Sequence, residues 1–482
     1  MNKRLISLIG AAVMLFTATG CAPKVASAKL TAPEQPDVYY FDRFGDEVMP
    51  IGGYVGPTAG FGYNGNYMPS QITDYHYKQV SDCGLNFVTG MNSDYKINAQ
   101  DVLDGLRYAD NNDVMYFVQD TYLYEVDDET ADDPSRYLNV TLEEYQERVS
   151  IYSSSPAFAG LEGRDEPFAN MFPQMQKILE YFNATFDDNK ILYMNSNSYQ
   201  CPSNWFGGGP NGTAEEAAMD IDGYMTAWFE SFPSLGYYSY DTYPFTTNEP
   251  FYIRTDIMEN YSKVREYSQR YGVPFWTFMQ AGGEWGGKNS GWRVPTEGEC
   301  LWQVSTALAF GAKGYTWYPY NIPPESPSTT ESCGALVGRA GQKLEPWYHA
   351  QKANMQTKAC DHILMKSVYK GLIQVKSGKP DSTNKCEIPA IEMNLPDVVG
   401  GKFREVTHIT GDNSITGCFN YQGRTMLYAV NNSVQNDNAK VYIHLDDVYK
   451  ATVIQRAQEY TVTGNVIELT FAAGEGACIV LN

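Results

Sequence analysis

The chain has 482 residues, of which 43% are apolar and 19% are charged, a composition typical of a folded globular protein with more than one domain. Its formal net charge of −22 argues against nucleic acid and anionic lipid surfaces as partners, because both need a basic protein face, whereas a neutral ligand fits. Aromatic residues make up 14% of the chain, and they either fill the core or form flat walls on which sugar rings can stack.

The N-terminal segment has the pattern of an export signal. Lys3 and Arg4 precede an apolar run, Leu5–Phe16, and small residues stand directly before Cys21. This arrangement is typical of a bacterial lipoprotein, in which the cysteine is the lipidated first residue. We therefore expect a signal peptide over 1–20, a tether over 21–38 and a membrane-anchored protein at the cell surface or in the periplasm. An ordinary cleaved export signal is the alternative.

Between residues 39 and 362, short apolar segments alternate with segments of helical periodicity. Helices are predicted over 98–112, 141–154, 171–186, 296–312 and 344–363, two of them beginning with the spacing of a capping box. Alternation of this kind gives a parallel sheet, and eight strands favour a closed (β/α)8 TIM barrel, an α/β fold. The eight predicted strands are Ile51–Val55, Leu85–Thr89, Met115–Gln119, Phe158–Leu161, Ile191–Asn195, Tyr237–Asp241, Pro274–Met279 and Gly314–Tyr318.

From residue 363 to 482 the pattern changes to strands joined by turns. The segments 423–433, 439–448 and 461–481 are rich in β-branched and aromatic residues, and Gly464-Asn465 is predicted as a hairpin turn. This region is expected to form a small all-β sandwich domain, which either supports the barrel or binds carbohydrate.

Active sites of barrel enzymes lie where the strands end, and the fourth predicted strand ends in the motif EGRDEP, 162–167. Its carboxylates either cap the next helix or act in a pocket. Asp165 can serve as the cap, which leaves Glu166 for chemistry. Candidate substrate-binding residues at the strand ends, each of which could instead be a cap or a packing residue, are Asp120, Asp165, Asn197, Tyr243, Gln280, Trp285, Trp317 and Tyr320.

Hydrolysis of a glycoside needs a carboxylic acid that protonates the leaving oxygen and a second carboxylate. Glu166 is the predicted general acid, and the second carboxylate is Asp241 or Glu284. No histidine follows a barrel strand, and the cysteines contain no C-x-x-C pair, which argues against a serine triad and a zinc site. No glycine-rich phosphate loop follows a strand either, so we expect neither a metal nor a cofactor, and a carbohydrate as the partner.

Four stretches together resemble the clan A glycoside hydrolases, with the family 42 β-galactosidases closest in pattern. Asp165-Glu166-Pro167 is similar to the Asn-Glu-Pro that carries the acid/base glutamate of that clan. SYDTYPF (239–245) and the segments 277–318 and 334–354 are similar to family 42 stretches in the same order along the chain. The resemblance spans residues 49–354 and implies a β-galactosidase-like enzyme acting on O-glycosidic bonds.

The sequence departs from that family at Gln280, where the family has its nucleophilic glutamate. Three interpretations stay open: an inverting enzyme in which Asp241 or Glu284 activates water, a retaining enzyme with Glu284 as nucleophile, or a degenerate barrel that only binds glycan as a surface lipoprotein. Asp165 replaces the asparagine of the clan, and its charge is expected to raise the pKa of Glu166.

Overall fold

A computed structural model describes most of the chain within one compact unit, Ala32–Asn482. The described residues are 38–63, 66–90, 93–124, 138, 140–186, 190–198, 201, 204–209, 212–247, 253–283, 291–322, 334–376 and 384–482. Cys21, Glu284 and Trp285 lie outside these ranges. In the part of the chain so described, no helix has the length and apolar character needed to cross a membrane.

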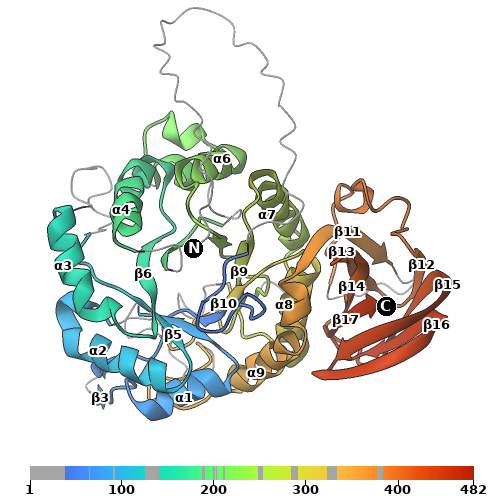
Figure 1. The fold of residues 1–482 in the computed structure, drawn as a ribbon, viewed down its shortest axis with the longest axis horizontal. Helices are drawn as coiled ribbons and strands as arrows, with labels where there is room; N and C mark the ends of the chain where they lie inside the picture. The colour runs from blue at the N-terminus through green and yellow to red at the C-terminus, as the bar shows by residue number, and fades with distance from the viewer. Residues whose placement is uncertain are drawn as a thin grey trace, which may run out of the picture. The chain divides into compact units, whose positions relative to one another are not determined.

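Eight parallel strands form a barrel, as the sequence predicts (Figure 1). The strands pair in the order β7-β6-β5-β4-β1-β10-β9-β8, and a parallel bridge between Ser196 and Tyr240 connects the two ends of the sheet. Each of the eight predicted segments contains or overlaps one of these strands. Their bounds are β1 (Ile51–Gly53), β4 (Phe87–Thr89), β5 (Met115–Val118), β6 (Phe158–Asp165), β7 (Ile191–Asn195), β8 (Tyr238–Tyr240), β9 (Phe275–Gln280) and β10 (Tyr315–Tyr318).

Helices surround the barrel strands (Figure 1), and a short hairpin, β2 (Phe61–Tyr63) and β3 (Asn66–Met68), follows β1. Both predicted capping boxes are present: Thr141 with Glu144 begins α3, and Thr296 with Glu299 begins α8. The helices are α1 (Asp74–Asp82), α2 (Tyr95–Asn111), α3 (Leu142–Ser153), α4 (Phe172–Thr185), α5 (Asn204–Gly207), α6 (Ile221–Ser231), α7 (Ile257–Tyr271), α8 (Glu297–Ala309), α9 (Glu345–Lys358) and α10 (Asp361–Leu364).

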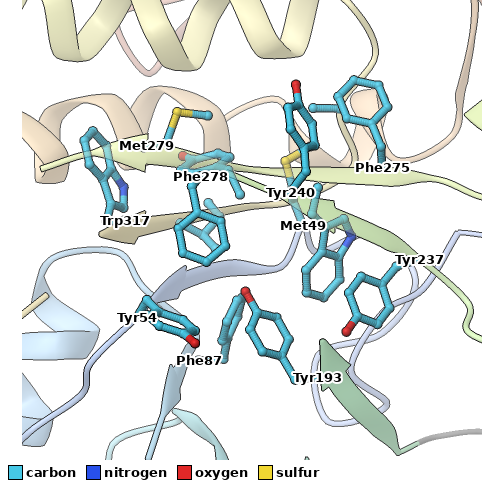
Figure 2. Close-up of a cluster of buried hydrophobic side chains, with 14 of the residues drawn as sticks. Met49, Tyr54, Phe87, Tyr193, Tyr237, Tyr240, Phe275, Phe278, Met279 and Trp317 are labelled. Carbon is cyan, nitrogen blue, oxygen red and sulfur yellow. The ribbon is translucent and has the colours of Figure 1, made fainter. Parts of the chain in front are cut away.

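Aromatic side chains fill the inside of the barrel. Figure 2 shows Phe87, Tyr193, Tyr237 and Phe278 pointing toward one another from different strands, with Tyr54 beside them. The rings of Phe87 and Tyr193 lie 6.0 Å apart, as do those of Tyr193 and Tyr237. Much of the aromatic content of the sequence therefore lies in the core of the barrel. The rings nearest the carboxyl ends of the strands support the residues that follow those ends.

The C-terminal region is an all-β domain made of one antiparallel sheet. The long strand β15 pairs with β12 along its first half and with β17 along its second half, while β16 runs beside both halves. The domain consists of β11 (Ser367–Val375), β12 (Val406–Gly411), β13 (Ser414–Tyr421), β14 (Arg424–Asn431), β15 (Ala439–Gln455), β16 (Gln458–Phe471) and β17 (Gly476–Leu481).

The predicted turn at Gly464-Asn465 is wrong. Both residues lie inside β16, where Gly464 pairs with Tyr449, and the turn is made by Arg456 and Ala457 with φ of 54° and 55°. The pairing register of β15 with β16 shifts between His444 and Tyr449. The segment Gly464-Asn465 of β16 therefore lies opposite a bulge in β15 instead of forming a turn.

Side chains of the β-sheet alternate between two cores. In β14, Met426, Tyr428 and Val430 join the core that includes the barrel, whereas Leu427 and Ala429 point into a separate core inside the β-domain. The barrel side of the sheet packs on α8, in which every residue from Glu299 to Ala309 is buried. The β-domain therefore supports the barrel at the helix that follows β9.

Candidate active site

A cavity of about 410 Å³ lies at the carboxyl ends of the barrel strands. Its polar lining comes from residues that end or follow strands β6, β7 and β8: Asp165, Glu166, Asn195, Ser198, Cys201 and Asp241. A smaller cavity of about 270 Å³ lies among segments that precede β9 and β10, at the other ends of the strands. Since barrel enzymes place their chemistry at the carboxyl ends, the larger cavity is the candidate active site.

Glu166 is held in the cavity wall by the backbone around it. Strand β6 ends at Asp165, and Glu166 adopts a left-handed conformation with φ of 48° while its N–H donates to the Asn195 carbonyl at 2.9 Å. The Asn197 amide donates to the carbonyls of Pro167 at 3.1 Å and Glu166 at 3.4 Å. A non-glycine residue with positive φ is uncommon and concentrates at functional sites.

Capping does not explain the two carboxylates. The turn Ala169–Met171 and helix α4 both begin without a hydrogen bond from a capping side chain. Asp165 and Glu166 both line the cavity instead. Of the two alternatives that the sequence left open, the pocket is therefore the one that the structure supports.

Glu166 and Asp241 form a hydrogen-bonded carboxyl pair. Burial, together with the charges of Asp241 and Asp165, raises the pKa of Glu166 to about 10. Burial and the charge of Asp165 raise the pKa of Asp241, the hydrogen bond with Glu166 offsets part of this rise, and the resulting pKa is about 7. The pair therefore holds one proton at neutral pH, with Glu166 as its carrier and Asp241 as the acceptor.

A hydrogen-bond network fixes the carboxylates from below. Asn195 accepts from the Ser239 hydroxyl at 3.0 Å, and its amide hydrogens bond to Asp165 and Asp241. Asp165 also bonds to Tyr54, which in turn bonds to Glu162. Burial and then the charge of Asp165 raise the pKa of Glu162 well above its usual range.

One side of the cavity is a continuous aromatic wall. Tyr54 packs against Phe278 with ring centroids 5.2 Å apart and against Tyr318 at 5.8 Å. Tyr243 continues the wall, 5.8 Å from Tyr318 and 6.4 Å from Trp292. Trp205 adds a further ring to the lining. Flat apolar faces beside carboxylates are suited to a sugar, whose C–H faces stack while its hydroxyls form hydrogen bonds.

The predicted residues Asp165, Glu166, Asp241 and Tyr243 all line this cavity. Asn197 does not, because its amide holds the loop that carries Glu166.

Asp120 was predicted to bind substrate, and the structure corrects this. Its carboxylate is fully buried and accepts two hydrogen bonds from Arg148, at 2.6 and 2.8 Å, and one from Tyr152 at 3.2 Å. Both oxygens are used within the protein, so Asp120 has a structural role.

Gln280 is also a structural residue and not part of the lining. Its side chain is fully buried, its Oε1 accepts from the Phe245 N–H at 2.9 Å, and its Nε2 lies 2.8–3.1 Å from the carbonyls of Phe245, Gly282 and Arg293. The amide thereby ties together two loops above the barrel.

Trp317 and Tyr320 were predicted as substrate-binding residues, but both are buried in the core. Trp317 is fully buried, its indole N–H donates to Asn354 at 2.9 Å, and Figure 2 shows its ring away from the central aromatic cluster. Tyr320 is 1% exposed. Aromatic residues at strand ends alternate between the two sides of the sheet, and these two point away from the cavity.

Several lining residues were missed from the sequence. Trp205 comes from the short helix α5 and Trp292 from a segment between β9 and α8, and neither residue was predicted to contribute to the site; Asn195 was predicted only as the end of a strand. Tyr54 and Phe278 lie in segments predicted as buried strands, yet both also line the cavity as part of its aromatic wall. Alternation along β9, with Trp276 and Phe278 on the inner side, was the signal that could have identified Phe278.

Comparisons with known proteins agree on the fold. No family of known sequences matches the chain, and no curated protein is similar to it. A solved glycoside hydrolase is 11% identical, with a TM-score of 0.53 over 94% of this chain and 97% of that chain. A family 5 glycoside hydrolase from Bacteroides vulgatus ATCC 8482 is 11% identical, with a TM-score of 0.52 over 90% of this chain and 88% of that chain.

A β-galactosidase from the psychrophilic Marinomonas ef1 is 10% identical, with a TM-score of 0.46 over 66% of this chain, and the chain spans 62% of its length. Likeness at these identities shows a shared architecture only, and does not distinguish family 42 from other families of barrel enzymes. Among the residues described, no group of three His, Cys, Asp or Glu side chains could hold a metal ion.

Proposed function

We propose that this protein is a glycoside hydrolase in which Glu166 is the general acid. The observation that carries the proposal is the buried Glu166–Asp241 pair in a cavity with an aromatic wall. A general acid must hold its proton until the leaving oxygen arrives, and the burial and neighbouring charges that raise the pKa of Glu166 provide this condition. The fold neighbours named as glycoside hydrolases support the same class of reaction.

Asp241 is proposed as the second carboxylate. In the free protein it accepts the hydrogen bond of Glu166, and a glycosidic oxygen that enters the cavity would take its place as the acceptor. Hydrogen-bonded carboxyls have oxygens about 2.5–3.0 Å apart. The two catalytic carboxyl groups are usually about 5–5.5 Å apart in retaining glycosidases and about 6.5–9.5 Å apart in inverting ones. Asp241 is therefore closer to Glu166 than the second carboxylate is in either of these mechanisms. Glu284 stays the other candidate for the second carboxylate.

The substrate is proposed to be a neutral oligosaccharide or polysaccharide. Asp165, Glu166 and Asp241 bring carboxyl groups to the cavity, and Arg254 in its lining pairs with Asp256 at 2.8 Å. A uronic acid or sulfated sugar would meet like charge there. A β-galactoside is the specific substrate suggested by the resemblance to family 42.

The test is a hydrolysis assay on aryl glycosides and on a panel of neutral oligosaccharides. Glu166→Gln keeps the size and backbone conformation of the side chain but has no proton to give. We expect this variant to lose at least about 100-fold in kcat on oligosaccharides, whose leaving groups need protonation. Aryl glycosides with acidic leaving groups should lose less. Equal activity of the variant and the wild type on oligosaccharides would exclude Glu166 as the acid.

A second candidate function is a glycan-binding protein without catalysis, and the structural use of Gln280 favours it. If no glycoside is cleaved but oligosaccharides bind, with loss of binding on Trp292→Ala, this alternative is correct. The proposals for the rest of the chain are a barrel domain over 39–362, a β-domain over 363–482 and export with lipid attachment at Cys21.

A further inference from the structure

Two carboxylate oxygens of the cavity lining, Asp165 Oδ1 and Asp241 Oδ1, have no hydrogen-bond partner among the residues that the structure describes. Asp241 is 8% exposed. A buried carboxylate oxygen without a donor costs free energy, and a ligand that brings an N–H or O–H group recovers it.

The cavity also lacks a described carboxylate in the position of a nucleophile. Its carboxyl groups come from the ends of β6 and β8, and the end of β9 is occupied by the Gln280 amide, which is saturated by backbone groups. Asp165 is held by Asn195 and Tyr54. Asp241 is hydrogen-bonded to the acid itself. Among these residues, none stands across the cavity from Glu166 to form a glycosyl ester.

We propose that the subsite beside Glu166 binds a 2-acetamido-2-deoxy sugar, whose own acetamido oxygen is the nucleophile while Asp241 accepts its N–H. This inference rests on the proposed function. Participation of a neighbouring substrate group is an established exception to the two-carboxylate mechanisms. It needs an acid, a carboxylate close to that acid and an apolar surface for the methyl group. Glu166, Asp241 and the wall formed by Tyr243, Trp292 and Tyr318 meet these needs.

The proposed reaction balances without any other reagent. The amide oxygen attacks the anomeric carbon, the bond to the leaving oxygen breaks, and Glu166 gives its proton to that oxygen. Asp241 takes the amide proton, which leaves a neutral oxazoline fused to the sugar. Water then attacks the anomeric carbon and gives a proton to Glu166, the oxazoline C–O bond breaks, and Asp241 returns its proton to nitrogen. The anomeric configuration is retained.

The first experiment compares aryl glycosides of 2-acetamido sugars with the 2-hydroxy sugars of the same gluco and galacto configuration. We expect kcat/KM to favour the acetamido substrates by at least about 100-fold, because the 2-hydroxy sugars lack the acetamido oxygen that attacks the anomeric carbon in the proposed reaction. Cleavage of the 2-hydroxy glycosides at equal or higher kcat/KM would overturn this inference and leave the proposed function standing. Absence of cleavage with both groups of substrates would refute both.

The second experiment uses the wild-type protein and acetamido substrates carrying one, two or three fluorines on the methyl group. Each fluorine makes the amide oxygen a weaker nucleophile, so the rate should fall steeply along the series. A flat series would indicate a protein nucleophile and overturn the inference.

The variant Asp241→Asn should lose at least about 100-fold in kcat/KM on acetamido substrates and should bind a sugar-fused thiazoline, a stable mimic of the oxazoline, more weakly. Asp82→Asn, which changes an exposed carboxylate on α1, is the matched control and should behave as wild type. Unchanged thiazoline binding by Asp241→Asn would overturn the role given to Asp241.

Discussion

Replacing Gln280 by glutamate looks like the restoration of a lost nucleophile, but the structure predicts that it destabilises the protein. The amide has two hydrogens, which it shares among the carbonyls of Phe245, Gly282 and Arg293. A carboxylate has none, so its second oxygen would face three carbonyl oxygens in a fully buried site. We expect Gln280→Glu to gain no hydrolytic activity.

The magnitude follows from the hydrogen bonds lost. Each buried polar group left without a partner costs about 1–3 kcal/mol, and at least two donated bonds disappear, so the free energy of unfolding should fall by about 2–6 kcal/mol. Gln303 gives a matched control, because its Nε2 donates a single bond, to the Gln280 carbonyl at 2.9 Å. Gln303→Glu should therefore cost about 1–3 kcal/mol.

The pH dependence of the loss is a further check. A carboxyl group at position 280 would have its pKa raised in the folded state, so the folded protein binds its proton more tightly than the unfolded chain. Stability is then lost as pH rises above the unfolded value of about 4.3. Urea denaturation of the wild type and both variants at about pH 4 and about pH 8 measures this. A Gln280→Glu protein as stable as the wild type at the higher pH would refute the role assigned to the amide.

Four other predictions concern the site, the domain contact and the N-terminus. Asn197→Ala releases the loop of Glu166 and should lower kcat by about 100-fold with little change in KM, measured on the best substrate found. The pH–rate profile of the wild type should rise through about 7 as Asp241 loses its proton and fall through about 10 as Glu166 loses its own; a flat profile would contradict the shared proton. Glu392→Ala leaves Arg265 buried without its partner and should cost about 3–5 kcal/mol in urea denaturation, unlike the exposed Asp82→Asn. Cys21→Ala should abolish incorporation of labelled fatty acid in cells, and persistence of the label would exclude Cys21 as the lipidated residue.

The barrel was predictable because its signals are local and repeated. Each barrel strand contains a buried apolar run, and the residue types of the two capping boxes were enough to predict where α3 and α8 begin. The predicted hairpin turn was wrong for a different reason: Gly464-Asn465 has the composition of a turn, but the pairing of β15 with β16 on both sides of the bulge outweighs that local preference.

The site was only partly predictable, because the direction in which a strand-end side chain points depends on residues far away in the sequence. Sequence position identified the strand-end residues Glu166 and Asp241, both of which line the cavity. It could not tell that Asp120 would meet Arg148, which lies 28 residues away, nor that Gln280 would meet Phe245, which lies 35 residues away. Tertiary contacts decide whether a polar side chain at a strand end faces substrate or protein.

The structural use of Gln280 and the contact between Glu166 and Asp241 belong to one arrangement. Once an amide at the end of β9 ties two loops together, that position cannot also present a charge to the cavity, because a carboxylate would lose the bonds that hold the loops. The charge nearest the acid then comes from β8, where Asp241 can share the proton of Glu166 and still keep one oxygen for a ligand. In the proposed mechanism, a barrel organised in this way holds Glu166 as the acid beside Asp241 as an acceptor, and the nucleophile comes from the substrate, from water or from Glu284. The chemical identity of the group that fills the acceptor position of Asp241 therefore decides which mechanism the cavity can support.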